Sequence, residues 1–585
     1  IKQTLAEFEQ RGVLDDDLLK TKVNIETGNI YSLQSVAGKV SSLAAFQTMT
    51  GDANYIAKDI ARYNKVTKQD VMRVYQRYIK NQGAAILSVV PEKMNKVDQL
   101  AILPQPDNFV LPDVTEPPLN SSDQPVAVVN KVNQSSFDRS RIPAAGKNPQ
   151  IKLPKLWQKR FDNGLKIIGT KNSETPTISL LLSLEGGPLL DPIEKAGLAS
   201  LTASLMEEGT TNYIKEALSN ELAKLGSSIS IGASGRNTYI QLSSLTKHFD
   251  ASLLLMYDMM FNPAFNQADF DRVKNQLLQS LEQADNDASS LATRAFKQTL
   301  FGTNNRVGYP DHGTVKTVTA ITLDDVKQFY QHYFSPSMAS MVVVGDIKKA
   351  DLLTKIAMFS HWRKKEYAIA DYLEFPKLDQ KKVLFIDLPD ASQSVISYSR
   401  RAMPFDTLGD YFKSTLMNYP IGGAFNSRIN LNLRENKGYT YGASSGYSGG
   451  KTLGSFSAKA SVKKAHTKDS MLEIMAELNR ASVDGLYTHE VEFMRQAISQ
   501  NEALSYETPG QKSAFLRQLL QFDLPIDYGE QQTKIINTIS IEVLNSIAKQ
   551  ELSKPMQWIV VGDGQVVKEQ LDALALEVID YSLVE

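Results

Sequence analysis

The stretch ITLDDVKQFYQHYFSPSMASMVVVGDI, residues 321–347, carries the local pattern that organises the chain. Its Thr322 can cap the N-terminus of a helix through the side-chain oxygen. Apolar residues such as Val326 and Phe329 then recur at helical spacing, which is typical of an amphipathic helix. After a short break comes a β-branched run, residues 342–344, which indicates a buried strand. The stretch therefore predicts a helix followed by a core strand.

The same pattern occurs twice more, in VTKQDVMRVYQRYIKNQGAAILSVVPE (66–92) and ISIEVLNSIAKQELSKPMQWIVVGDG (539–564). Repetition of this kind indicates that one supersecondary unit has been copied along the chain. Strand-rich segments accompany only the second and third copies, at residues 157–184, 382–399 and 441–462. Within the first of these segments, Asn163-Gly164 predicts a hairpin turn. The alternation of strands with long helices predicts an α+β fold.

A proline-rich segment separates the first copy from the others. Residues 103–155 hold nine of the 23 prolines, with much Ser, Asn and Gln, and such a composition cannot bury enough apolar surface to fold alone. At 585 residues the chain is also too long for a single core. We expect a truncated module over 1–95, a linker over 96–155, and full modules over 156–375 and 376–585. Because the first module lacks its opening strands and residue 1 is not methionine, we expect the chain to be part of a longer protein.

Composition excludes several classes of function. The 64 Lys and Arg residues balance 65 Asp and Glu residues, so the chain lacks the basic excess that nucleic-acid binding requires. The absence of cysteine excludes disulfides, thiolate metal sites and cysteine nucleophiles. No apolar run approaches the ~18 residues of a membrane-spanning helix, so we expect no transmembrane segment.

The stretch KAGLASLTASLMEEGT, residues 195–210, resembles the zinc helix of the M16 (pitrilysin, or insulinase-like) peptidases, G-L-A-H-x-x-E-H-M-x-x-x-G-T. The frame is kept, but the histidine positions hold Ser200 and Ser204, and the glutamate position holds Ala203. Zinc requires imidazole, thiolate or carboxylate ligands. These are degenerate zinc-site positions, and we expect neither a metal nor a catalytic residue in this chain.

Neighbouring residues do not supply the missing ligands. The resemblance places the counterpart of the family's third zinc ligand, a glutamate, near Gln279 or Ser280. Glu207 and Glu208 are adjacent, so they cannot both face inward from one helix. We interpret them as solvated residues at the helix end.

A second stretch, YPIGGAFNSRINLNLRENKGYTYGASS (residues 419–445), resembles the family's substrate-binding segment. Arg434 and Tyr441 match the Arg and Tyr of that pattern, with Gly438 between them. The resemblance implies that both side chains contact the substrate carbonyl and the oxyanion of the transition state. On residue identity alone, they would be a surface arginine and a half-buried tyrosine.

The resemblance covers nearly the whole chain except the linker. M16 proteins have four related lobes that form the two halves of a clamshell, with zinc in the first lobe. The resemblance therefore implies repeated lobes, each a mainly antiparallel sheet packed with helices: two full lobes (156–375 and 376–585) and the end of a third (1–95). The segment 96–155 would connect the two halves of the clamshell.

Two functions remain open at this point. In the first, the chain is the non-catalytic, substrate-binding portion of an M16-type zinc metalloendopeptidase. Its partners are a zinc-bearing M16 half, covalent or separate, and a peptide or unfolded-protein substrate, and the resemblance suggests the cell envelope or periplasm. In the second, it is a degenerate M16 structural subunit without peptidase activity, like the core subunits of respiratory complexes.

Overall fold

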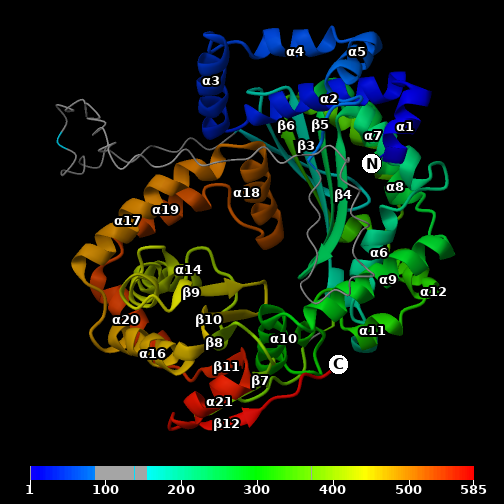
Figure 1. Ribbon diagram of the computed structural model, residues 1–585. Coiled ribbons are helices and arrows are strands. Elements are labelled where there is room, and N and C mark those ends of the chain that lie inside the picture. Colours follow the sequence, from blue (N-terminus) through cyan, green and yellow to red (C-terminus); the bar gives the residue numbers. More distant parts are fainter. Residues whose placement is uncertain (1, 86–137, 139–154, 371) are drawn as a thin grey trace, which may run out of the picture. The chain divides into compact units, whose positions relative to one another are not determined.

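The computed structural model describes residues 2–85, 138, 155–370 and 372–585 (Figure 1). By its internal contacts the chain divides into two units, Ile1–Val13 with Thr67–Lys147, and Leu14–Val66 with Asn148–Glu585. The predicted linker lies almost wholly outside the described residues, as does the strand predicted after residue 85.

The described part of the first unit contains helices α1 (Lys2–Arg11) and α5 (Lys68–Tyr78). The α5 helix begins at the predicted cap, where Thr67 and Asp70 form a reciprocal capping box. The two helices meet through Phe8 and Tyr75, whose ring centroids lie 5.0 Å apart in an edge-on arrangement. The Tyr75 hydroxyl also donates a hydrogen bond of 2.7 Å to Glu9.

The second unit opens with helices α2 (Asp15–Ser32), α3 (Val36–Thr50) and α4 (Ile56–Asn64) and continues into a six-stranded sheet. The strands of this first sheet are β1 (Leu156–Arg160), β2 (Lys166–Lys171), β3 (Thr177–Glu185), β4 (Ser228–Ser234), β5 (Asn237–Leu245) and β6 (Ala339–Gly345). They lie in the order β1-β2-β6-β3-β5-β4, and only the β2–β6 pair is parallel. The predicted Asn163-Gly164 turn joins β1 to β2, with Gly164 at φ 99°.

One face of the first sheet is covered by helices from the same half of the unit (Figure 1). Leu180 and Leu182 of β3 pack there with Met256 and Phe329 in one continuous core. The helices of this half are α6 (Leu198–Met206), α7 (Lys215–Leu225), α8 (Phe249–Phe261), α9 (Gln267–Ala284), α10 (Ala288–Phe301), α11 (Val315–Thr319), α12 (Leu323–Tyr333) and α13 (Lys349–Lys355).

The second six-stranded sheet comprises β7 (Lys382–Asp387), β8 (Gln393–Ala402), β9 (Thr440–Gly449), β10 (Gly454–Lys463), β11 (Gln557–Gly562) and β12 (Glu577–Asp580). Its order is β12-β7-β11-β8-β10-β9, and β7 pairs in parallel with β11 and β12. Its helices are α14 (Asp410–Asn418), α15 (Arg428–Asn430), α16 (Thr467–Val483), α17 (Thr488–Glu502), α18 (Pro509–Phe522), α19 (Tyr528–Thr538), α20 (Ile541–Leu552) and α21 (Gly564–Asp572). Two π-helical turns, η8 (Tyr419–Gly423) and η9 (Leu431–Asn436), follow α14 and α15.

The other face of each sheet is covered by a helix from the opposite half. From the second half, α18 places Phe515, Leu516 and Leu519 against Ile168, Val342 and Val344 of the first sheet. From the first half, α10 places Leu291 and Ala295 against Ile559 and Val561 of the second sheet. Since α10 and α18 occupy the same position in the element order of their halves, the exchange is reciprocal and joins the two sheets through apolar contacts.

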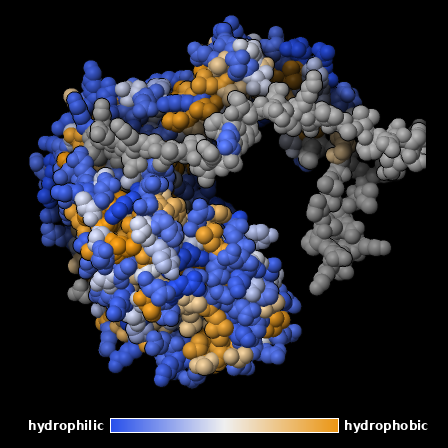
Figure 2. All heavy atoms as spheres, turned by 90° about the vertical axis from the view of Figure 1, so that its left-hand side faces the viewer, coloured by the Kyte–Doolittle hydropathy of each residue, from blue (hydrophilic) through white to orange (hydrophobic). Residues whose placement is uncertain are grey.

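The local predictions for the second and third copies are confirmed. Thr322 caps α12 and Ser540 caps α20, and each helix leads into a buried central strand, β6 or β11. The fold class is also confirmed as α+β, with two mixed sheets packed with helices. Apolar side chains on the face shown in Figure 2 form separate patches between polar ones. Within the described ranges, no helix has the length and apolarity needed to cross a membrane.

Candidate functional site

Helix α6 carries Ser200, Ala203 and Ser204, the three positions predicted to be a degenerate zinc site. Every residue of α6 except Ser204 is buried. The Ser200 hydroxyl lies 3.0 Å from the backbone oxygen of Asp311 and 3.4 Å from that of Ala233, and it can donate its one proton to either. Ala203 is buried in the core of the first sheet. Ser200 and Ala203 therefore serve the packing of the helix, and only Ser204 is exposed.

The N-terminus of α6 is fixed by a buried ion pair. One Asp191 oxygen accepts from the backbone N–H of Gly197 at 2.9 Å, and the other accepts from that of Ala199 at 2.8 Å. The guanidinium of Arg306 lies 2.9 Å from the same carboxylate. Burial raises the pKa of Asp191 to about 6, and Arg306 opposes that rise. Gly197 is required here because its φ is 103° and a Cβ would lie 2.6 Å from the backbone oxygen of His312.

The C-terminal end of α6 is fixed by carboxylates. Glu207 accepts from the backbone N–H of Ile231 in β4 at 2.6 Å, and its loss of hydration raises its pKa. Glu208 is buried and forms ion pairs with Lys215 and Arg272. The interpretation of this pair as solvated helix-end residues is therefore wrong: both carboxylates have protein partners, because the chain beyond α6 turns back against β4 and α9.

The residues present around α6 do not fit zinc. A serine hydroxyl that already donates to the backbone and a buried methyl group offer no imidazole, thiolate or carboxylate ligand. Gln279 and Ser280 lie on α9 and are exposed. No cluster of three His, Cys, Asp or Glu residues suited to a metal ion occurs in the described ranges.

The turn between α15 and β9 carries the other candidate residues. Arg434 lies within the π-helical turn η9, and the backbone N–H of Gly438 donates to its carbonyl at 3.1 Å. Gly438 adopts a φ of 65°, which ends the helical segment and directs the chain into β9. The side-chain oxygen of Asn430 accepts from the backbone N–H of Ala443 at 3.0 Å and ties α15 to the strand. The glycine of the sequence pattern is therefore explained by a backbone requirement.

Tyr441 lies on β9, an edge strand of the second sheet, and its side chain is 88% exposed. The Arg434 guanidinium lies 4.6 Å from the centre of the Phe425 ring, and its Nε is 3.3 Å from a Glu435 oxygen. Among the described contacts, none joins the side chains of Arg434 and Tyr441. The structure thus places both residues beside one turn, where each remains accessible to another molecule.

The sequence analysis did not identify Asp191 and Arg306, which hold the start of α6. They lie 115 positions apart in the chain, and neither belongs to a recognisable motif. The only local signal is an acidic residue shortly before a helix, which is common at helix N-termini. Their pairing is a tertiary contact and has no sequence signature.

The two mixed sheets, with matching helices around each, define a duplicated α+β protein whose degenerate helix has no metal-ligand set. Residues 166–310 match the family model described as Insulinase (Peptidase family M16). Residues 320–498 match the model described as Peptidase M16 inactive domain. The chain belongs to peptidase family M16.

Relatives and solved structures agree with this assignment. A Helicobacter pylori protein named Non-peptidase homolog YmxG is 24% identical over 387 residues, covering 66% of this chain and 88% of that protein. The crystal structure of a peptidase M16 inactive domain from Pseudomonas fluorescens has a TM-score of 0.64 and 21% identity, covering 70% of this chain and 98% of that one. The periplasmic protease PqqL from Escherichia coli has a TM-score of 0.57 and 17% identity, covering 75% of this chain and 52% of that one.

Proposed function

We propose that this chain is the non-catalytic, substrate-binding portion of an M16-type zinc metalloendopeptidase. It would complete a closed chamber with a zinc-bearing M16 half, covalently attached or separate, which would hold the metal and carry out hydrolysis. The substrate would be a peptide or an unfolded segment of protein. A periplasmic location is part of this proposal, and the solved periplasmic protease of similar fold supports it.

The observation that carries the proposal is the exposure of Tyr441 at the start of β9, an edge strand of the second sheet. Further along β9 the edge is covered, because the Ala443 N–H donates to Asn430 and the carbonyls of Ser445 and Tyr447 accept from Asn418 and Tyr411. A substrate would therefore meet Tyr441 where the strand begins, before this covered part of the edge. The Tyr441 hydroxyl would be free to contact the substrate, since no hydrogen bond joins it to another described residue. Arg434, in the π-helical turn before β9, provides a second hydrogen-bond donor, and this one is positively charged.

The geometry around Arg434 supports the same assignment. Single π-helical turns are rare and occur frequently at functional sites, because they re-aim a side chain at some cost in regular hydrogen bonding. The guanidinium of Arg434 rests on an exposed ring, Phe425, and pairs with an exposed carboxylate, Glu435. Such solvent-exposed contacts are weak, so a substrate carbonyl could replace them at little cost.

The proposed domain organisation follows from this function. Residues 1–95 would be the end of the second lobe, 96–155 the linker between the halves, and 156–375 and 376–585 the third and fourth lobes. The reciprocal packing of α10 and α18 supports treating the last two as one half of the chamber, since it fixes each lobe against the other through apolar contacts.

The test is peptide cleavage by the complete protein, zinc half included, with Tyr441→Phe. Loss of one donor to a transition-state oxyanion commonly lowers turnover by ~10²–10³, so we expect a decrease of that size. The control is Tyr487→Phe, which removes the hydroxyl of another exposed tyrosine in the same half. Unchanged turnover in Tyr441→Phe would remove Tyr441 from the mechanism.

A second candidate function is a structural subunit without peptidase activity, favoured by the relative that is named a non-peptidase homolog. The two functions differ in the rest of the assembly. A complete gene product or partner carrying an H-x-x-E-H helix supports the peptidase, whereas one with only degenerate helices supports the structural subunit. Absence of peptide cleavage by a zinc-loaded full assembly would overturn the first proposal.

A further inference from the structure

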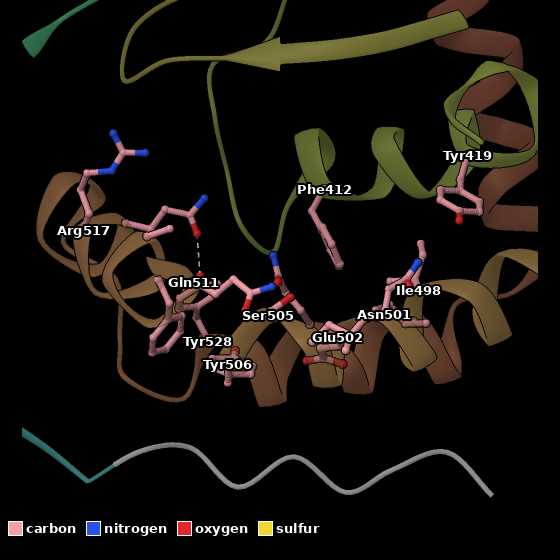
Figure 3. Close-up of a pocket in the computed structure, with 16 residues that line it drawn as sticks. Phe412, Tyr419, Ile498, Asn501, Glu502, Ser505, Tyr506, Gln511, Arg517 and Tyr528 are labelled. Carbon is pink, nitrogen blue, oxygen red and sulfur yellow. Dashed lines mark hydrogen bonds between the residues drawn. The ribbon is translucent and has the colours of Figure 1, made fainter. Parts of the chain in front are cut away.

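A pocket of about 690 Å³ lies between the helices of the second half (Figure 3). It is bounded by α14, η8, α17, α18, α19 and the short 3-10 turn η11 (Ala503–Tyr506). Its volume falls within the range of ~300–1,000 Å³ that is usual for small-molecule sites. No motif in the sequence pointed to it, because its lining combines residues 412 and 419 with residues from the separate segment 498–536.

The walls of the pocket are rich in aromatic rings. Phe412 and Tyr419 project into it from α14 and η8, and Tyr506 lines the opposite side (Figure 3). Tyr506, Phe515 and Tyr528 pack together there: the Tyr506 and Phe515 centroids are 4.9 Å apart edge-on, and those of Phe515 and Tyr528 are 5.4 Å apart. The face of an aromatic ring carries partial negative charge, so such walls favour a cation over a neutral or anionic group.

A carboxylate, Glu502, lies among these rings and is half-buried. Its hydrogen-bond donor is Thr533, whose hydroxyl lies 2.8 and 2.9 Å from the two carboxylate oxygens. A hydroxyl has one proton, so it satisfies only one oxygen at a time. Burial raises the pKa of Glu502, and no Lys or Arg in the described ranges offsets that effect. Arg517 lies in the lining as well, but its side chain is exposed at the rim.

We propose that this pocket binds an organic cation, an alkylammonium or guanidinium group, with Glu502 as its counter-ion and the surrounding rings in contact with its apolar parts. A half-buried carboxylate without a cationic partner is unfavourable unless a ligand supplies the charge. Rings on both sides would contact the ligand's hydrocarbon. A ring face near the charged group would add cation–π attraction. A free small molecule and the Lys or Arg side chain of a polypeptide share this chemistry.

The experiment is calorimetric titration of the 585-residue chain with two probes: N-acetyl-arginine methylamide and the peptide acetyl-Ala-Ala-Arg-Ala-Ala-amide. Their citrulline counterparts, which keep the shape but lose the charge, serve as ligand controls. We expect both arginine probes to bind and the citrulline forms to bind at least about tenfold more weakly. Tighter binding of the peptide would identify a polypeptide as the source of the cation, and equal binding would identify a free molecule.

Two variants locate the site. Glu502→Gln keeps an oxygen for the Thr533 hydroxyl, so it should fold and should weaken binding of both arginine probes about tenfold or more. Its matched control is Glu492→Gln, an exposed carboxylate on the same helix, which should bind as the unchanged protein does. Phe412→Leu should weaken binding about threefold.

Equal binding of arginine and citrulline probes, or undiminished binding by Glu502→Gln with an unchanged unfolding temperature, would overturn the proposal. No peptidase assay enters this experiment. The cation site therefore stands or falls independently of the proposed role in peptide hydrolysis.

Discussion

The two halves of the second unit share a fold but differ in which parts of it they bury. Each has a six-stranded mixed sheet and a helix that packs on the sheet of the other half. In the first half, helix α6 is almost wholly buried. Hydrogen bonds to Asp191 at its start, from Ser200 in its middle and to Glu207 at its end fix it to the rest of the fold. In the second half, the turn into β9 leaves Tyr441 exposed at a strand edge. The helix with the predicted degenerate zinc-site positions is thus almost wholly buried, whereas the start of β9 is exposed to solvent.

The burial of α6 is energetically possible because its buried polar groups have partners. A buried polar group is tolerated only when it has hydrogen-bond partners, and every polar group on the buried side of α6 has one. Thr202, for example, donates to the backbone oxygen of Leu198 at 2.8 Å. Tyr441 has no such constraint, because its hydroxyl is in solvent. Substitutions in the buried helix α6 should therefore change the free energy of unfolding. Substitution of the exposed Tyr441 should change substrate binding or turnover instead.

The largest effect on stability is expected from Asp191→Ala, which leaves the buried Arg306 guanidinium without its carboxylate and removes the acceptors of two backbone N–H groups. Breaking a buried ion pair typically lowers the free energy of unfolding by about 3–5 kcal/mol. Urea unfolding at pH 7.5 measures it. The control is Asp250→Ala, which breaks an ion pair with Lys355. The Asp250 side chain is 66% exposed, so this substitution should change the free energy of unfolding by less than about 1 kcal/mol. Equal effects in the two variants would show that α6 is not held by Asp191.

A smaller effect distinguishes the two serines that stand at the histidine positions. Ser200→Ala removes a buried donor to the Asp311 carbonyl and should lower the free energy of unfolding by about 1 kcal/mol. Ser204→Ala changes an exposed side chain and should stay within about 0.5 kcal/mol. The same urea titrations compare them. A larger loss for Ser204→Ala would mean that the outer face of α6 is covered in solution.

The smallest effect concerns the contact between the halves at Glu185, at the end of β3. Partial burial raises the pKa of Glu185, but Lys451 of the β9–β10 hairpin and Arg236 lower it by more, so the net shift is downward. A lowered carboxyl pKa contributes stability that is present at neutral pH and is lost as the pH falls through the folded-state value. Lys451→Met should therefore lower the free energy of unfolding by about 0.5 kcal/mol at pH 7. The difference should shrink only as the pH falls through the lowered folded-state value, below about pH 4.

Lys549→Met provides the control for this last prediction, because Lys549 is exposed and lies on α20, away from Glu185. Unfolding of all three proteins is compared across the same pH series. A Lys451 effect that stays constant to well below about pH 4, where the Glu185 carboxyl is protonated, would exclude its ion pair with Glu185 as the cause.

Much of the local structure could be predicted from the sequence. The caps at Thr322 and Ser540, the Asn163-Gly164 turn and the central strand containing Val342–Val344 follow from neighbouring residues, because capping, turn geometry and side-chain periodicity act over a few positions. The α+β class follows from their alternation. The domain limits and the roles of Arg434 and Tyr441 stay predictions.

The pairing of distant segments could not be predicted in this way. The exchange of α10 and α18, the Asp191–Arg306 pair and the Glu502 pocket each join residues that are far apart in the chain. Apolar helices look alike in sequence whichever sheet they cover, because the hydrophobic effect is not directional. The burial of Glu207 and Glu208 could not be predicted either, because their partners Ile231 and Arg272 lie on β4 and α9.

The sequence by itself determined which atoms are available: Ser200, Ala203 and Ser204 cannot supply zinc ligands in any fold, since coordination requires particular donor atoms. Only the tertiary structure decided that Ser200 is buried and bonded to the backbone oxygen of Asp311, while Tyr441 is exposed to solvent on an edge strand. Side-chain identity is fixed by covalent chemistry, whereas burial depends on which distant residues meet.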